Sequence, residues 1–222
     1  MPKKETNLKP RVPLSKERIL EGAIILADKK GVDSLTMRKL AETLGIEAMS
    51  LYHHIATKEE VLDGMVDMVF SEIVLPFGEA DWKTAMQQRA QSTRAVFSRH
   101  TWAIGLMESR TNPGPMTLRN LDAVVGSLRT AGFSIEMAAH AFSVLDSYVY
   151  GFVLQEVKLP FKTSAELEKV AETILQQMPD DGYPYLSEMM QEQALKPGYN
   201  YTKEFEFGLD LILEGLERVS KQ

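Results

Sequence analysis

Apolar residues recur at intervals of three and four along nearly the whole chain, and this spacing predicts α-helices. Glycine and proline fall in clusters, whereas a β-sandwich would place turn signals about every 8–12 residues. Beyond residue 80 the pattern predicts helices over about 82–99, 102–110, 116–131, 135–157, 164–178, 184–195 and 202–219. The chain is therefore predicted to be all-α.

Four shorter helices are predicted before residue 75, and their ends carry capping residues. Ser15 is the expected N-cap of the first helix, and Gly31 is expected to end it in a left-handed conformation. Thr36 and Gly45 bound a second short helix in the same way. Residues 47–54 then make a third helix.

The fourth helix opens with the segment TKEE at 57–60, in which Thr57 and Glu60 have the spacing of a capping box. We expect this helix to run to Ile73 and the residues PFG at 76–78 to end it. The domain boundary is placed there. It separates an N-terminal three-helix helix-turn-helix domain with its connecting helix, over 1–75, from a larger C-terminal helical domain over 76–222.

Two of the later helices are apolar on more than one side. The helix over 135–157 has apolar or small residues in nearly every direction. The last helix carries Phe205, Leu209, Ile212, Leu216 and Val219 at alternating spacings of four and three, with Phe207, Leu211 and Leu213 widening the stripe. Helices of this kind are buried on more than one face, which predicts a deep core and a subunit interface.

Composition and charge narrow the possible functions. The 222 residues include no cysteine, so disulfides, thiolate metal sites and cysteine nucleophiles are excluded. We see no signal-peptide core and no apolar run near 18 residues, and so expect a cytoplasmic protein with no membrane partner. The net charge is −6, but residues 1–60 hold 11 Lys/Arg against 9 Asp/Glu, and the remainder holds 14 against 22. Residues 1–60, here called the head, are mildly basic, and the remainder, here called the body, is acidic. This distribution is compatible with phosphate contact by the head.

The stretch LTMRKLAETLGIEAMSLYHHI at 35–55 has the pattern of a helix-turn-helix, two short helices joined by a glycine turn. Its apolar residues Leu40, Leu44, Ile46, Leu51 and Ile55 can close a core with the first helix. Arg38, Lys39 and Lys58 lie in first helical turns, where the helix dipole disfavours cations by a few tenths of a kcal/mol. Solvated surface positions are one interpretation of these cations; contact with phosphate oxygens is the other and the better supported.

The aromatic and histidine residues at the end of this stretch admit three interpretations. A helical tyrosine usually joins the core, yet Leu51 and Ile55 already take the core face, so Tyr52 is expected to point at a backbone phosphate. Adjacent helical residues diverge by about 100°, so His53 and His54 cannot easily share a metal ion. We therefore expect no metal and no cofactor.

Residues 18–65 resemble the DNA-binding head of the TetR family of bacterial transcriptional regulators. The shared marks are a first helix that ends in glycine, then T-x-R-x-L-A-x-x-L-G, S-L-Y-x-H-[FVI] and K-x-x-L/V-L. The body resembles the tetracycline-repressor branch, through Trp82, "AGFS", "GFVLQE" and "FEFGLDLILEGLE". The resemblance implies a homodimeric repressor, which binds a palindromic DNA operator and responds to a small-molecule effector.

The resemblance also implies roles for single residues. Arg38, Ala48, Met49 and Ser50 would face base edges, and Thr36, Tyr52, His54 and Lys58 would hold the DNA backbone. The tetracycline repressor has glutamine and proline where this chain has Ala48 and Met49. These two residues offer only apolar contact, for instance to a thymine methyl, so the operator is expected to differ.

The magnesium ligands of the tetracycline repressor, a histidine and a glutamate, align with Leu106 and Gln155. Neither side chain is a good ligand for a hard cation, which argues against a magnesium–tetracycline effector. Other candidates mix apolar walls with a few polar groups, as ligand pockets do. They are Trp102, Met107, Arg110, Phe142 and Asp146, and ordinary core or surface roles are at least as common for each.

Two competing functions stay open from the sequence. One is a helical enzyme or small-molecule carrier whose head is only a structural subdomain. No G-x-G-x-x-G, P-loop, H-E-x-x-H or G-x-S-x-G motif supports it, and we expect no enzymatic activity. The other is a constitutive architectural DNA-binding protein that needs no ligand. Such a protein would have little need for the long helical region after the N-terminal domain.

Overall fold

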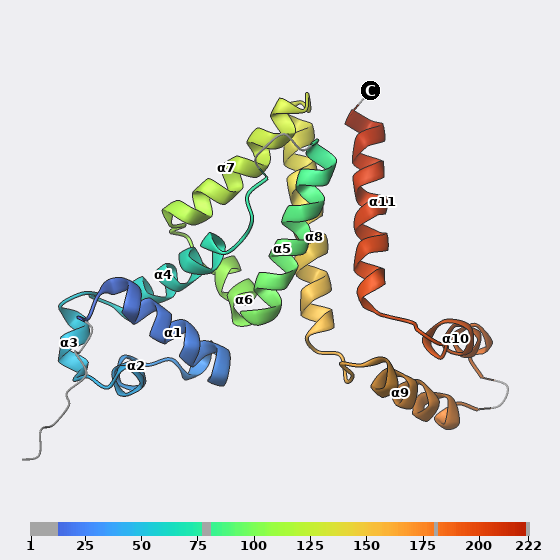
Figure 1. Cartoon of the computed structure of the whole chain (residues 1–222), viewed down its shortest axis with the longest axis horizontal. Helices are drawn as coiled ribbons and strands as arrows, with labels where there is room; N and C mark the ends of the chain where they lie inside the picture. The colour runs from blue at the N-terminus through green and yellow to red at the C-terminus, as the bar shows by residue number, and fades with distance from the viewer. Residues whose placement is uncertain (1–12, 77–80, 180–181, 221–222) are drawn as a thin grey trace, which may run out of the picture. The chain divides into compact units, whose positions relative to one another are not determined.

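The computed structural model describes residues 13–76, 81–179 and 182–220, which form eleven α-helices and no β-strand (Figure 1). The all-α prediction is confirmed. The helices are α1 Lys16–Lys30, α2 Met37–Leu44, α3 Ala48–Tyr52, α4 Lys58–Ser71, α5 Trp82–Arg99, α6 Trp102–Glu108, α7 Pro115–Thr130, α8 Ile135–Glu156, α9 Ser164–Gln177, α10 Pro184–Met189 and α11 Thr202–Ser220. A 3₁₀ turn, η1 (Val32–Ser34), follows α1, and a π-helical turn, η2 (Met190–Ala194), follows α10.

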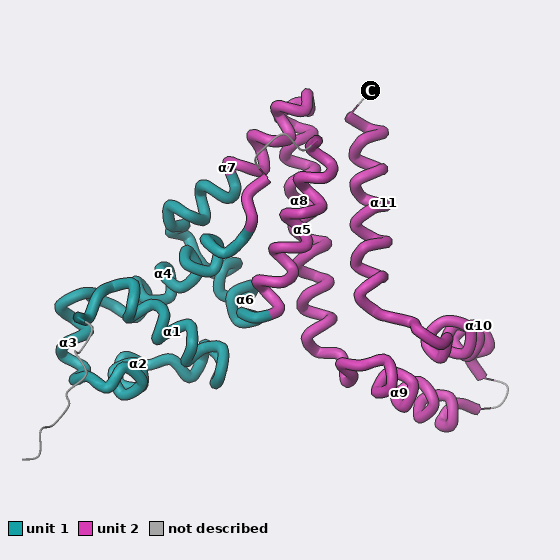
Figure 2. The backbone as a smooth tube through the Cα atoms, in the orientation of Figure 1, with its two compact units in different colours: residues 1–73, 99–121 teal, residues 74–98, 122–222 magenta. Residues whose placement is uncertain are grey.

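The contacts divide the chain into two compact units (Figure 2). Unit 1 comprises residues 1–73 and 99–121, and unit 2 comprises residues 74–98 and 122–222. Unit 1 therefore holds α6 and the beginning of α7 in addition to the first four helices. The remainder of α7 belongs to unit 2, together with nearly all of α5.

Unit 1 is built around α1, which packs against α2 and α4. Leu40, Leu51 and Ile55 are buried beside the apolar face of α1, while Leu44 and Ile46 are only partly buried. The axes of α1 and α4 approach closely at Gly64, where an added Cβ would lie 2.8 Å from both terminal carbons of Leu20. Helix α2 contacts both α1 and α3, so it links the short helix α3 to α1.

Unit 2 has one hydrophobic core shared by α5, α7, α8 and α11. Its fully buried members include Met86, Leu128, Phe133, Val149 and Phe205. The hydroxyl of Tyr148 on α8 donates to the backbone carbonyls of Glu204 (3.1 Å) and Phe205 (3.0 Å) on α11. Gly208 leaves room for this contact, since an added Cβ would overlap the Tyr148 hydroxyl.

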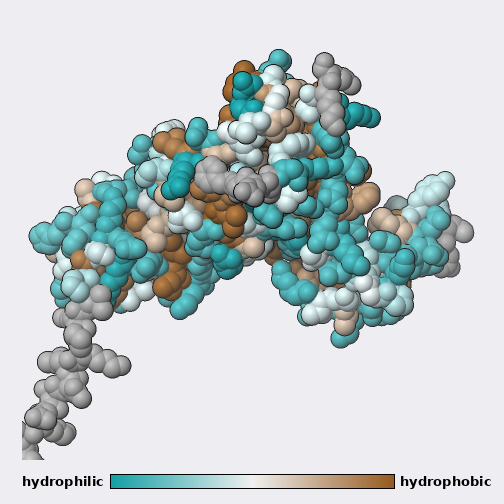
Figure 3. Space-filling view, turned by 45° about the horizontal axis from the view of Figure 1, so that its top comes forward, coloured by the Kyte–Doolittle hydropathy of each residue, from teal (hydrophilic) through white to brown (hydrophobic). Residues whose placement is uncertain are grey.

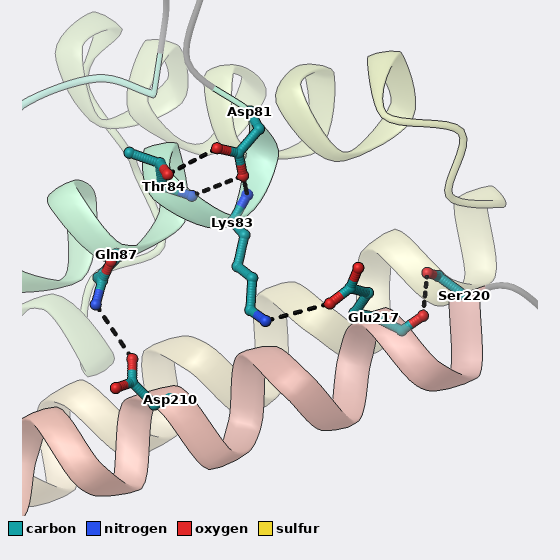
Figure 4. Close-up of polar contacts among 7 residues, drawn as sticks. All are labelled: Asp81, Lys83, Thr84, Gln87, Asp210, Glu217 and Ser220. Carbon is teal, nitrogen blue, oxygen red and sulfur yellow. Dashed lines mark hydrogen bonds and ion pairs between the residues drawn. The ribbon is translucent and has the colours of Figure 1, made fainter.

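Polar contacts also join α5 to α11 within unit 2 (Figure 4). Lys83 Nζ lies 3.2 Å from Glu217 Oε2, and the side-chain amide of Gln87 donates to Asp210 Oδ1 at 3.1 Å. Asp81 accepts hydrogen bonds from the backbone N–H and the hydroxyl of Thr84 and so caps the start of α5. These contacts hold α5, the first helix of unit 2, against α11, its last helix.

Most predicted helix boundaries agree with the structure to within two residues. The third helix is shorter than predicted, Ala48–Tyr52 instead of 47–54, and the fourth ends at Ser71, before Ile73. Thr57 accepts from the backbone N–H of Glu60 as expected, but the Glu60 carboxylate accepts from Ala56 N, one residue before the predicted partner. Phe77 and Gly78, which were predicted to end the helix, lie outside the described residues.

Helix α8 is long and apolar enough to cross a membrane by length and composition alone, unlike the expectation from apolar runs. The core helices of water-soluble proteins have the same property, and α8 contributes seven buried residues to the interior of unit 2. The face drawn in Figure 3 is mainly hydrophilic with hydrophobic patches between. Among the described residues, large apolar side chains at least half exposed include Met49, Phe207 and Leu211.

Candidate nucleic-acid interface

The segment between Thr36 and Tyr52 folds as two short helices around a glycine turn. Thr36 Oγ1 accepts from Lys39 N at 3.2 Å and begins α2. Gly45 ends α2 in the left-handed region, with φ 67° and ψ 38°, where a side chain would be strained. The chain therefore turns sharply into α3, and these two helices contact each other.

Helix α3 buries one residue and exposes most of the others. Leu51 is fully buried, whereas Met49 is 70% exposed and Tyr52 is 46% exposed. Ala48 and Ser50 are partly exposed, and His54, just beyond the helix, is exposed. A large, exposed methionine beside an exposed tyrosine has no use in the core, so this face is available for contact with another molecule.

Cations border this face on two neighbouring helices. Arg38 on α2 is 87% exposed at its side chain, and Lys58 begins α4, partly exposed. Among the described residues, no carboxylate lies within ion-pair distance of the Lys58 ammonium. A lysine in a first helical turn gains little from its own helix, so the Lys58 ammonium is available to an anionic group of another molecule.

Glu60 holds the corner between α3 and α4. Its carboxylate lies 2.6 Å from Lys16 Nζ on α1 and accepts from Ala56 N at 3.0 Å. These contacts, first the hydrogen bond from Lys16 and then that from Ala56, lower the pKa of Glu60 below its ordinary value. The charged form of Glu60 therefore helps to fix α3 relative to α1 and α4.

Helix α4 presents three acidic residues one turn apart, which bind Arg110, just beyond the end of α6, and the start of α7 inside unit 1. Arg110 lies 2.5 Å from Glu59 and 2.6 Å from Asp63, and these contacts raise its pKa, Asp63 having the larger effect. Asp67 Oδ1 accepts from the backbone N–H (2.8 Å) and the hydroxyl of Thr117 at the start of α7. Helix α4 thereby joins the segment near α3 to α6 and the first turn of α7.

A second polar link ties α1 to the start of α6. Asp28 Oδ1 accepts from the indole N–H of Trp102 at 2.7 Å and lies 2.9 Å from Nδ1 of His100. The other ring nitrogen of His100 lies 3.4 Å from Glu72. His100 and Trp102 are both buried, so this link holds the end of α1 against the first residues of α6.

The sequence-predicted effector contacts are distributed over both units. Trp102, Leu106, Met107 and Arg110 lie in unit 1, and Phe142, Asp146 and Gln155 lie in unit 2. Met107 and Arg110 line a cavity of about 40 Å³ beside Asp63 and Thr117. A cavity of this size is far below the roughly 300–1,000 Å³ of ligand pockets.

Asp146 belongs to a buried polar cluster between α5 and α8. Its Oδ1 lies 2.6 Å from Arg89 Nη1, and its Oδ2 accepts from the Tyr150 hydroxyl at 2.9 Å. Burial, together with the charge of Asp146, raises the pKa of Tyr150. Thr93, one turn from Arg89, is fully buried, and its hydroxyl has no hydrogen-bond partner among the described residues. Sequence analysis missed Arg89, Thr93 and Tyr150, although their helical spacing from core positions was a visible signal.

Two grooves, also missed from the sequence, lie at the C-terminal end of α8. One, of about 240 Å³, is lined by Phe161, Tyr199 and Tyr201 among others, and the second, of about 440 Å³, is lined by Gln91, Arg94 and Ser98 among others. Glu156 and Lys162 line both. Only the second has a volume typical of ligand pockets.

Two family models match the chain. The model of bacterial regulatory proteins of the tetR family matches residues 19–65. The model of the tetracycline-repressor-like C-terminal domain matches residues 75–220, more than half of the chain. The first match begins within α1 and ends within α4, and the second covers α5–α11.

Individual proteins agree with these matches. The transcriptional repressor DrrR1 of Streptomyces coeruleorubidus is 30% identical over 217 residues, which cover 94% of this chain and 79% of that protein. The class D tetracycline repressor of Escherichia coli is 26% identical over 208 residues, covering 92% and 89%. The structure of the TetR family protein ActR of Streptomyces coelicolor with actinorhodin has a TM-score of 0.76 at 25% identity, covering 95% of this chain and 100% of that one.

Proposed function

The chain belongs to the TetR family of bacterial transcriptional regulators, and on this premise we propose that it is a ligand-responsive, dimeric DNA-binding regulator and assign roles to its residues. Regulators of this family are soluble, non-enzymatic DNA-binding proteins. We extend both properties to this chain, as a cytoplasmic repressor without catalytic activity. The alternative of a helical carrier or enzyme with a merely structural head is not favoured by the matches.

We assign residues 1–75 to DNA binding and 76–222 to effector binding and dimerisation. The observation that carries the DNA assignment is the exposed face of α3 with its bordering cations. Met49, Ala48 and Ser50 would meet base edges in the major groove together with Arg38, the first two only through apolar contact. Thr36, Tyr52, His54 and Lys58 would fix the register by contacts to sugar and phosphate.

The dimer interface is proposed on α8 and α11, which pack against each other in unit 2. Both helices expose large apolar side chains in addition to those they bury. Phe207 and Leu211 on α11 are 64% and 55% exposed, and Val144 on α8 is 42% exposed. A second copy that covers these residues would present two heads to half-sites about 34–36 Å apart on a palindromic operator.

The effector is proposed to bind in the helical body. Its candidate contacts are Phe142, Asp146 and Gln155 in unit 2, and, taken separately, Trp102, Leu106, Met107 and Arg110 in unit 1. Neither Leu106 nor Gln155 can ligate a hard cation well. The effector is therefore proposed to bind without a magnesium ion. A compound library screened by thermal shift tests this, since an effector raises the melting temperature by mass action, and a hit that needs Mg²⁺ contradicts the metal-free assignment.

The salt dependence of DNA binding tests the phosphate contacts. Each phosphate that a protein cation neutralises contributes about −0.9 to the slope of log K against log salt concentration. Lys58→Ala is expected to make the slope shallower by about 0.9, the contribution of one phosphate contact. Lys29 is an exposed cation at the far end of α1, and Lys29→Ala is expected to leave the slope unchanged. Equal slopes in the wild type and Lys58→Ala would remove Lys58 from the interface.

A further inference from the structure

Arg38 is engaged by an acidic residue of its own helix. Its Nε donates to Oε1 of Glu42 at 3.0 Å, four residues later on α2. Both side chains are exposed, at 87% and 60%. Among the described residues no group accepts a hydrogen bond from Nη1 or Nη2 of Arg38. The guanidinium is thus held at its inner nitrogen while its outer edge, with the two terminal nitrogens, faces solvent.

The pair contributes little to the stability of α2. Arg38 is the second residue of the helix, where the dipole disfavours a cation. An ion pair four residues apart stabilises a helix more when the acidic residue precedes the basic one, and here the order is reversed. Pairs this exposed are also screened by solvent. The main consequence of the contact is therefore the orientation that it gives to Arg38.

Orientation matters for the chemistry by which an arginine recognises a base. A guanidinium reads guanine through two parallel hydrogen bonds to O6 and N7, and two neighbouring N–H groups must point the same way. A free arginine side chain loses conformational freedom when it is fixed in this geometry. Because Glu42 binds only Nε, the Nη1–Nη2 edge keeps both donors for the base.

We propose that Glu42 is a positioning residue, which orients the terminal edge of Arg38 toward a guanine in the major groove. The inference rests on the proposed base-reading role of Arg38. Fixing one flexible side chain at an interface corresponds to about a two- to tenfold change in affinity. Loss of Glu42 is expected to lower discrimination at one base pair by that factor, since only the bonds to the correct base need the oriented edge.

A carboxylate near DNA has a second, opposite effect that the experiment must separate. Its negative charge repels phosphates, and its removal raises affinity for every sequence alike. The ratio of affinities for two duplexes that differ at one base pair cancels this general effect. Glu42→Gln removes the charge but keeps an acceptor oxygen at the same length, so it is the conservative variant that should rescue discrimination.

The test uses full-length protein and a duplex selected by the wild type. Arg38→Ala identifies the base pair that Arg38 reads, by loss of preference at that position alone. Affinities for this duplex and for one with the G·C pair replaced by A·T are then compared at one salt concentration. We expect Glu42→Ala to reduce the ratio two- to tenfold, Glu42→Gln to stay within twofold of the wild type, and Glu21→Ala, an exposed acid on α1, to change nothing.

Two results would overturn the role of Glu42. Glu42→Ala could keep the wild-type ratio, as it would if it raised both affinities equally, or Glu42→Gln could lose as much discrimination as Glu42→Ala. If Arg38→Ala changes the preference at no base pair, the base-reading role of Arg38 fails and the role of Glu42 fails with it. Because the pair is exposed, circular dichroism should show that all variants fold.

Discussion

The buried ion pair of Arg89 and Asp146 allows a sharp prediction about the stability of unit 2. The two side chains are 2% and 8% exposed, and their charged atoms are 2.6 Å apart. Asp146→Ala would remove the carboxylate that lies beside the buried guanidinium, and breaking a buried ion pair in this way costs about 3–5 kcal/mol. It would also leave the Tyr150 hydroxyl without an acceptor, a loss of about 1–3 kcal/mol that is not fully additive.

A loss of about 4 kcal/mol is large against the roughly 5–15 kcal/mol by which folded proteins are stable. We expect Asp146→Ala to unfold at much lower urea concentration than the wild type, measured by circular dichroism at one fixed protein concentration because a dimer's stability depends on it. The double variant Arg89→Met/Asp146→Leu should recover the part of the loss that comes from the buried charge, since apolar residues of similar volume replace buried ion pairs at little cost, while the Tyr150 hydroxyl still lacks its acceptor.

Either of two results would refute this reasoning. One is a loss below about 1 kcal/mol in Asp146→Ala, which would mean that solvent reaches the pair. The other is a double variant as unstable as the single one, which would mean that packing at these positions, not charge compensation, supports the core. In the absence of effector, operator binding by the folded double variant should match the wild type, because the pair belongs to unit 2 and the proposed DNA contacts belong to unit 1.

Three further predictions concern the proposed DNA site, the dimer and the corner at Glu60. Met49→Gln should change the base preference of the selected operator, because glutamine can bond adenine bidentately and methionine cannot; an unchanged consensus would place Met49 away from the bases. Phe207→Glu/Leu211→Glu should yield monomers in sedimentation and weaken operator binding, whereas Ile25→Glu, a comparable exposed change in unit 1, should not; a variant that stays dimeric contradicts the proposed interface. The pKa of Glu60 is lowered in the folded state, so its stabilisation is complete above the ordinary glutamate pKa, about 4.3, and is lost as the pH falls below it. The stability gap between the wild type and Glu60→Gln should therefore shrink on acidification from pH 6 to pH 3, and a constant gap in urea titrations would exclude this linkage.

The helices could be predicted from the sequence because local residues determine their ends. Ser15, Thr36 and Thr57 each accept a hydrogen bond from the residue three positions later, as expected of N-caps. Gly31 and Gly45 both end their helices with positive φ, but only Gly45, with ψ 38°, has the expected left-handed helical conformation, since ψ is 151° at Gly31. These signals act over a few residues, so reading along the chain is sufficient to find them.

The buried polar links could not be predicted, because they join residues far apart in sequence. Asp28 and Trp102 are 74 residues apart, and Arg89 and Asp146 are 57 apart. Trp102 and Asp146 were singled out as effector contacts from their chemistry, without the partners that bury them. No local pattern showed that Asp28 would meet Trp102 or that Arg89 would meet Asp146, since helix packing decides those contacts.

Selection from a random duplex library tests the central claim, sequence-specific binding by the face of α3, most directly. The purified wild type and the variant Tyr52→Ala/Lys58→Ala would be compared at low salt, with and without candidate effectors. We predict a palindromic consensus for the wild type with half-sites about one helical turn apart, and loss of that consensus in the variant. The proposal would be contradicted if the wild type enriched no sequence under either condition, or if the wild type and the variant selected the same consensus.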